Sequence, residues 1–312
     1  MNTHVVVGSG PIGSRIALLL AEAGDHVRVL TRSGGGPDHP QVERVAADAS
    51  DTAGLRSHVN GATAIYNCAN PVYTRWDTDW PPIAAALLEA AASTGAVLAT
   101  VSNLYGYGRV KGAIGPDTPL DPCDHKGEIR VRMWQDALAA HEAGRVRVVE
   151  VRASDYADAG ANSHLARNAP AVIAGRRAWV VGSADRPHSW TTTHDTARAL
   201  VQLAADESAH GKAWIVPSAP PRTQREALGD IAQAADAPQP RIGVLGPRAL
   251  RTVGLAVPML RELSGTAYQF TAPFVVDDAA TRSHLGWQAQ AWPETVERVV
   301  DAARTTAASG VS

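Results

Sequence analysis

Short runs of β-branched and apolar residues alternate with longer segments of helical spacing through the first half of this 312-residue chain. The first run, 5–7, is followed by Ile16, Leu19, Leu20 and Ala23, which recur at the spacing of one helix face. Strands and helices that alternate in this way predict an α/β protein with a doubly wound parallel sheet. The predicted strands span 5–7, 26–30, 42–47, 64–68, 96–101 and 145–151, and the predicted helices span 51–59, 81–93 and 126–142.

The pattern changes in the second half, where prolines cluster and strands become sparse. Helical spacing predicts helices over 163–174, 194–205 and 223–235, and shorter apolar runs predict strands over 177–181 and 213–216. We therefore expect a first domain at 1–155, to which 176–216 partly returns. A smaller C-terminal, helix-rich substrate lobe is expected to be formed mainly by 156–312.

The most informative stretch is a G-x-G-x-x-G turn between the first predicted strand and the first predicted helix. In such a turn Gly8 permits the tight bend, Gly10 lets the backbone approach a pyrophosphate, and Gly13 lets the helix pack close to the strand. The helix start at Pro11 and Ile12 adds backbone N–H groups and the positive end of a dipole. This context predicts a Rossmann-type dinucleotide-binding domain. An ordinary glycine-rich turn is the alternative.

The end of the second predicted strand bears on the choice of dinucleotide. It reads Thr31, Arg32, Ser33, with no acidic residue at its tip. An acid there binds the ribose of NAD, whereas an Arg accommodates the 2′-phosphate of NADP. The guanidinium can hold a phosphate with two hydrogen bonds, and the two hydroxyls can add to them. We expect NADP rather than NAD, with a solvated Arg32 as the alternative.

Composition narrows the classes of partner. The formal net charge of -2 offers no basic surface for nucleic acid. No apolar run approaches the roughly 18 residues that span a membrane. Cys68 and Cys123 give no disulfide framework, and the histidines lack metal-ligand spacing, so no metal is expected. We expect a soluble cytoplasmic protein that binds a small-molecule substrate, and a homodimer is left open.

These motifs resemble the extended short-chain dehydrogenase/reductase family, which includes NAD(P)-dependent epimerases and dehydratases, and the resemblance covers most of the chain. More closely, the stretches YNCANPVYTRW, SNLYGYG and RASDY resemble an actinobacterial subgroup described as epimerase-like. The resemblance implies that Asp48 and Ala49 contact the adenine. It implies that Cys68, Ala69 and Asn70 line the ribose, and that Ser102 hydrogen-bonds a substrate oxygen.

The chain departs from the family at the helix that follows this serine. The family has a Tyr-x-x-x-Lys pair there, in which the Tyr is the general acid/base and the Lys holds the nicotinamide ribose. The matching stretch, 122–130, contains no Tyr, and the helix pattern places Lys126 and Arg130 at the two positions. We expect Arg130 to hold a ribose or phosphate and Lys126 to donate a proton. An exposed Lys126 at the helix start is the alternative.

Other polar and aromatic residues follow the predicted strands at the edge where ligands bind. Tyr105 and Tyr107 could donate the proton instead of Lys126, or could serve in packing. Candidate substrate contacts are Tyr73, Tyr107, Asp155, Tyr156 and Trp190. Asp155 is open to a role as substrate anchor or base and to one as a helix or turn cap.

We expect an NADP(H)-dependent oxidoreductase that acts on a small organic carbonyl, alcohol or related double bond. The expected catalytic residues are Ser102, Tyr105, Lys126 and Arg130. Two alternatives stay open: a non-redox isomerase, cyclase or epimerase on the same fold, and a nucleotide-sensing binding protein without turnover.

Overall fold

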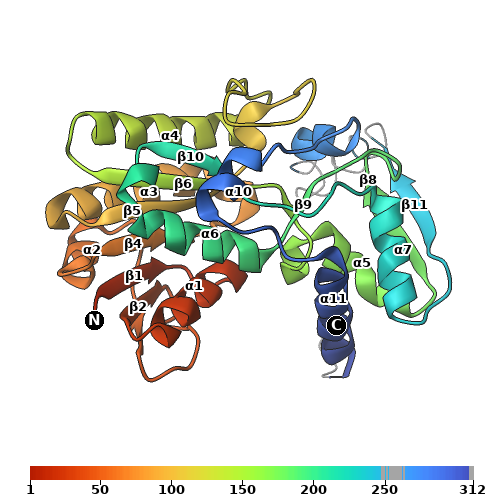
Figure 1. The fold of residues 1–312 in the computed structure, drawn as a ribbon, viewed down its shortest axis with the longest axis horizontal. Coiled ribbons are helices and arrows are strands. Elements are labelled where there is room, and N and C mark those ends of the chain that lie inside the picture. Colours follow the sequence, from red (N-terminus) through yellow and green to blue (C-terminus); the bar gives the residue numbers. More distant parts are fainter. Residues whose placement is uncertain (247–249, 251, 253–261, 263, 309–312) are drawn as a thin grey trace. The chain divides into compact units, whose positions relative to one another are not determined.

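The structure is a computed structural model that describes residues 1–246, 250, 252, 262 and 264–308. The chain divides into two compact units (Figure 1). Unit 1 combines Met1–Gly108, Pro119–Ala153 and Thr196–Val216. Unit 2 combines Arg109–Thr118, Ser154–Asp195 and the described part of 217–312.

Unit 1 is built on a seven-stranded parallel sheet in the order β10-β6-β5-β4-β1-β2-β3 (Figure 1). The order reverses at β1, so the sheet is doubly wound, and the Rossmann-type α/β fold predicted from the sequence is confirmed. Its strands are β1 Thr3–Val7, β2 His26–Thr31, β3 Val42–Ala46, β4 Ala64–Asn67, β5 Val97–Asn103, β6 Arg147–Ala153 and β10 Lys212–Ile215. Its helices are α1 Pro11–Glu22, α2 Thr52–Val59, α3 Trp76–Thr94 and α4 His125–Glu142, with short 3₁₀ turns η1 Tyr73–Arg75 and η2 Tyr105–Tyr107.

One face of this sheet is covered by α2, α3 and α4. Val5 and Val7 of β1 contribute alternate side chains to this core, as expected for a strand whose neighbours lie on opposite faces. Leu55 of α2, Leu87 of α3 and Trp134 of α4 pack into the same core. These core side chains are almost fully buried, because helices cover the face of the parallel sheet. Their packing fixes the carboxyl ends of β1, β4 and β5 relative to one another.

Unit 2 has two small parallel sheets instead of one large one. One pairs β8 (Arg177–Val181) with β11 (Arg241–Leu245), and the other pairs β7 (Asp155–Tyr156) with β9 (Trp190–Thr191). A separate apolar core packs residues of β8, β9 and β11 against α5 (His164–Ile173), α7 (Gln224–Ala234) and α11 (Trp292–Ala308). Unit 2 also contains α10 Ala279–Leu285, η3 Gly160–Asn162 and η5 Ala267–Phe270.

The structure shifts several predicted boundaries. The helix predicted from residue 81 begins at Trp76, because burial of Trp76 and Trp80 extends it ahead of its two prolines. The return to the first unit begins at 196, inside α6 (Thr193–Ala205), and not at 176, since β8 pairs within unit 2. The last residues of the predicted lobe, 309–312, lie outside the described residues.

Two shorter segments complete the described fold. η4 (Glu207–Ala209) leads into β10 at the edge of the large sheet. Residues 109–118, predicted within the first domain, belong to unit 2, where the Ile114 amide donates to the Val275 carbonyl. Within the described part of the chain, no helix combines the length and apolarity needed to cross a bilayer.

Candidate active site

The glycine turn between β1 and α1 has three glycines in three different environments. Gly8 has φ +98°, and a Cβ built there would lie 2.5 Å from the Cys68 carbonyl oxygen. A Cβ on Gly13 would overlap the Gly8 carbonyl oxygen. A Cβ on Gly10 would meet no atom within 4 Å. Gly8 and Gly13 are therefore required by the packing of the protein itself, whereas the space at Gly10 is open to a ligand.

The first turn of α1 faces that open space with its backbone donors. Gly10 is the N-cap residue, and no side chain caps the helix start. Pro11 occupies the first helical position, where its missing N–H removes no helix hydrogen bond. Ile12 and Gly13 follow it in the turn. Uncapped N–H groups and the positive helix end suit a pyrophosphate, so this turn fits the predicted dinucleotide.

The tip of β2 carries the residues expected to distinguish NADP from NAD. Thr31 is half-buried, and its hydroxyl donates to the Gly35 carbonyl oxygen at 3.0 Å. Arg32 is exposed. Asp48 accepts hydrogen bonds from the amide and hydroxyl of Ser50, and these bonds, together with the charge of Arg32, lower its pKa below the ordinary value. The structure thus places Arg32 and Asp48 close together on unit 1. The neighbouring predicted contacts are Ser33, which is exposed, and Ala49, which is half-buried.

The loop after β4 lies against the glycine turn. The Cys68 amide donates to the Val7 carbonyl oxygen at 2.9 Å, which continues the β1–β4 pairing into the loop. Burial raises the pKa of the half-buried Cys68 thiol to about 12, so the thiol stays protonated. Asn67 accepts a hydrogen bond from the Ala69 amide at 3.3 Å, whereas Asn70 is exposed. The loop predicted to line the ribose therefore borders the turn predicted to bind the phosphates.

Lys126 and Arg130, the two cations predicted for the site on α4, are buried against aromatic rings. Lys126 is 1% exposed and Arg130 is 8% exposed, so the alternative of an exposed Lys126 is wrong. The Lys126 Nζ lies 4.4 Å from the ring centroid of Tyr73 and 5.9 Å from that of Trp76. The Arg130 guanidinium lies 4.8 Å from the Trp76 centroid and 4.3 Å from the Trp80 centroid. We call these five residues the cation–aromatic cluster, in which the ring faces attract both charges.

Tyr105 lies beside the cation–aromatic cluster. Its hydroxyl is 3.4 Å from the hydroxyl of Tyr73, and its ring centroid is 6.0 Å from that of Trp76. The Tyr105 amide donates to the Asn103 side chain at 3.1 Å, which fixes the turn after β5. The structure therefore brings together Tyr73, Tyr105 and Lys126 from three separate segments.

Ser102 and Tyr107 line a small crevice at the end of the same strand. Ser102 is 5% exposed and lines this crevice together with Arg130, Tyr107 and Arg152. The Arg152 guanidinium donates to the Tyr107 hydroxyl at 2.8 Å and to the Glu150 carboxylate at 2.7 Å. Tyr107 is 3% exposed whereas Tyr105 is half-buried, so Tyr105 is the more accessible of the two as a proton donor.

The remaining predicted substrate contacts belong to unit 2. The Asp155 carboxylate is 2.9 Å from the His188 Nε2. Burial opposes ionisation of Asp155, but the hydrogen bond and charge of His188 hold its pKa below the ordinary value. Tyr156 is half-buried beside it in β7. Trp190 is buried, and its Nε1 donates to the Arg222 carbonyl oxygen at 3.0 Å. Asp155 thus serves as the partner of a buried histidine.

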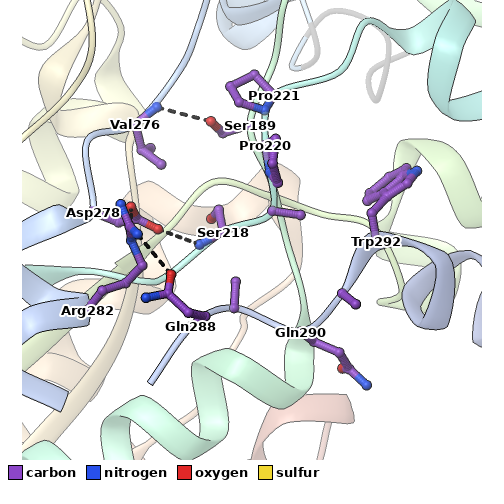
Figure 2. Close-up of a pocket in the computed structure, with 13 residues that line it drawn as sticks. Ser189, Ser218, Pro220, Pro221, Val276, Asp278, Arg282, Gln288, Gln290 and Trp292 are labelled. Atoms are coloured by element: carbon purple, nitrogen blue, oxygen red, sulfur yellow. Dashed lines mark hydrogen bonds and ion pairs between the residues drawn. The ribbon is translucent and has the colours of Figure 1, made fainter. Parts of the chain in front are cut away.

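Unit 2 also contains a cavity of about 370 Å³ (Figure 2). On one wall, Asp278 accepts hydrogen bonds from the Ser218 amide and the Arg282 guanidinium, each at 2.8 Å. Figure 2 shows Gln288 beside Arg282, and Trp292 across the cavity from them. Its volume is in the range of small-molecule pockets. None of the residues singled out from the sequence lines it.

Sequence reasoning missed several residues that shape these sites. These residues include Arg152, Glu150 and His188. The signal for Arg152 and Glu150 was two opposite charges at alternate positions beside the apolar residues Val148, Val149 and Val151, which indicates a buried ion pair. No local signal pairs His188 with Asp155, because 33 residues separate them.

No protein-family model matches the chain, and no curated protein sequence matches it. Solved structures do resemble it over nearly its whole length. A dTDP-glucose 4,6-dehydratase double mutant from Streptomyces venezuelae, with NAD bound, is 20% identical, with a TM-score of 0.77 and 97% of each chain covered.

A UDP-glucose 4-epimerase from Thermotoga maritima is 15% identical, with a TM-score of 0.80 and coverage of 98% of this chain and 100% of the other. A UDP-glucuronic acid 4-epimerase from Bacillus cereus, in complex with NAD, is 13% identical, with a TM-score of 0.79 and coverage of 97% and 99%. At these identities the likeness shows a shared fold.

Proposed function

We propose that this protein is a nicotinamide-dinucleotide-dependent enzyme of the short-chain dehydrogenase/reductase type. The observation that carries the proposal is the glycine turn, in which Gly8 and Gly13 are required by packing and Gly10 borders open space at a helix start. Several proteins of the same fold are named as dehydratases or epimerases and were solved with NAD. When bound, a nicotinamide would supply or remove a hydride.

The substrate class we propose is a small organic carbonyl, alcohol or related double bond. Tyr105 or Lys126 would transfer the proton of the substrate oxygen, and Ser102 would hydrogen-bond that oxygen. Arg130 would hold a ribose or phosphate through its guanidinium. The support for this assignment is that Lys126 and Arg130 are buried on α4 beside Tyr105, at the carboxyl edge of the sheet, where ligands bind in this type of fold.

We propose NADP as the preferred cofactor, although the neighbours solved with a cofactor carry NAD. The support is the exposed Arg32 at the tip of β2, where no carboxylate stands that would repel a 2′-phosphate. Fluorescence titration with NADPH and with NADH tests this choice. Tighter binding of NADPH is expected, and equal affinities would contradict it.

A second candidate is a non-redox isomerase or epimerase that keeps its dinucleotide bound. It is favoured by the absence of the Tyr-x-x-x-Lys pair on α4 and by the epimerases among the structural neighbours. Net change in nicotinamide absorbance during turnover separates the two candidates. A reductase consumes NADPH in proportion to product, whereas an epimerase leaves the total unchanged. A chain that binds the cofactor but converts neither carbonyl nor alcohol substrates would be a sensor.

A further inference from the structure

Two tyrosines reach the same place from the ends of neighbouring strands. β4 and β5 pair in parallel, and each is followed by a turn that carries one of the phenols, η1 with Tyr73 and η2 with Tyr105. Their hydroxyl oxygens are 3.4 Å apart. This is long for an O–H···O bond, but catalytic hydrogen bonds are often long without ligand and tighten when substrate binds. The two hydroxyls can therefore exchange a proton directly.

Trp76 fixes both phenol rings. Its ring centroid lies 5.3 Å from that of Tyr73, edge to face, and 6.0 Å from that of Tyr105. Trp76 is itself 3% exposed and faces the Arg130 guanidinium. Aromatic contacts at these separations orient rings specifically, so neither phenol is held by its hydroxyl alone.

The start of α4 approaches Tyr105 so closely that only glycine fits at position 127. A Cβ on Gly127 would lie 2.5 Å from the Tyr105 carbonyl oxygen and 2.9 Å from the Pro122 Cβ. The same helical turn carries Lys126, whose Nζ lies over the Tyr73 ring at 4.4 Å. The close approach at Gly127 therefore sets the position of the ammonium relative to both phenols.

The charges around the two phenols favour a negative oxygen. Lys126 and Arg130 contribute two buried positive charges, and His125 Nε2 lies 3.2 Å from the Lys126 Nζ. Asp124 and the exposed Glu128 are acidic residues at this helix start. Burial raises the pKa of Asp124, although hydrogen bonds from the Gly127 and Lys126 amides act in the opposite direction. The Lys126 Nζ lies 4.4 Å from the Tyr73 ring centroid, and a positive charge near an acid stabilises its charged form, so this arrangement favours a phenolate in the pair.

We propose that Tyr73 and Tyr105 form one acid–base unit, in which Tyr105 exchanges a proton with the substrate and Tyr73 relays it, while Lys126 stabilises the phenolate. This inference rests on the proposed function. The substrate oxygen takes the Tyr105 proton, in a reduction for which a bound nicotinamide would supply the hydride. The Tyr105 phenolate takes the proton of Tyr73, and solvent reprotonates Tyr73. Tyr105 is then the catalytic residue, and Tyr73 and Lys126 are positioning residues.

The test uses the near-ultraviolet absorbance of tyrosinate, recorded while the pH of the full-length protein is raised without cofactor or substrate. In wild type, one tyrosine is expected to ionise at lower pH than the others. Tyr73→Phe and Tyr105→Phe should each change the pH at which this tyrosine ionises, because the two groups titrate as a pair. Lys126→Met should move this ionisation to higher pH. Tyr268→Phe is the matched control, because the Tyr268 ring also faces a cation, Arg109, at 5.3 Å, and should leave the ionisation unchanged.

The proposal is overturned if no tyrosine of the wild-type protein ionises at lower pH than the others. It is also overturned if this early ionisation occurs at the same pH in wild type, Tyr73→Phe and Lys126→Met. If Tyr73→Phe fails to fold, as judged by far-ultraviolet circular dichroism, Tyr105→Phe and Lys126→Met decide the matter. The absorbance measurement needs no nicotinamide, so the two proposals can fail separately. A protein in which one tyrosine ionises early but which binds no NADPH would contradict the proposed function and would still support the Tyr73–Tyr105 pair.

Discussion

The glycine turn and the cation–aromatic cluster both belong to unit 1, but they depend on the sequence in different ways. The turn is made by six consecutive residues, 8–13, and its fit to a ligand depends on backbone and on missing side chains. The cluster is assembled from η1, α3 and α4, and its properties depend on side chains that lie up to 57 residues apart, from Tyr73 to Arg130. A motif of the first kind can be recognised along the chain, whereas one of the second kind depends on the topology.

The largest expected effect is that of Gly10→Val, which tests the turn as a ligand site. No protein atom lies within 4 Å of a Cβ at Gly10, so the variant should fold normally and lose dinucleotide binding. NADPH titration and thermal unfolding measure the two properties. Gly13→Ala is the matched comparison, because its Cβ would overlap the Gly8 carbonyl and should destabilise the fold itself. Normal NADPH binding by a folded Gly10→Val protein would contradict the assignment.

The next effect tests the cluster as the source of chemistry. Lys126→Met removes the ammonium but keeps most of the buried volume, so kcat on an identified carbonyl or alcohol should fall by roughly 10²–10⁴, as for the loss of general acid–base catalysis. NADPH affinity should change little, because the turn at 8–13 is untouched. Steady-state kinetics with NADPH titration separates these two quantities. Full activity in Lys126→Met, Tyr105→Phe and Tyr107→Phe would leave the assigned edge without a proton donor.

The difference between the two sites also explains which parts of the fold and of the candidate site could be predicted from the sequence. The strand runs and the glycine spacing predict the sheet and the turn correctly, because both follow from local periodicity and from backbone geometry. The start of α3 at Trp76 was missed, since tertiary burial of two tryptophans outweighed the local signal of the prolines. The stacking of Arg130 on Trp80 and the pairing of Tyr73 with Tyr105 were not predictable, because they require the register of β4 beside β5.

A smaller effect tests Arg32, at the tip of β2, as the residue that selects the cofactor. Arg32→Ala should remove most of the expected preference for NADPH over NADH, about 1–3 kcal/mol, the range for hydrogen bonds to charged groups. The variant should also relieve one influence that lowers the pKa of the neighbouring Asp48, without altering the Ser50 hydrogen bonds. Parallel titrations of both cofactors measure the ratio of affinities. An unchanged ratio in Arg32→Ala would mean that the guanidinium is a solvated loop charge.

The smallest effect concerns the loop that packs on the turn. Burial raises the pKa of Cys68 from its ordinary value of 9.0 to about 12, so the folded protein keeps this thiol protonated at neutral pH. Because the folded state holds the proton more tightly, this contribution to stability is present below pH 9.0 and is lost as the pH rises toward 12.

A thiol-alkylating reagent should therefore modify the exposed Cys123 quickly and Cys68 only after unfolding. Mass spectrometry of Cys123→Ser, with and without denaturant, isolates Cys68. Rapid labelling of Cys68 in the folded variant would mean that the loop opens away from Gly8, and that the turn is less rigidly fixed than its backbone contacts indicate.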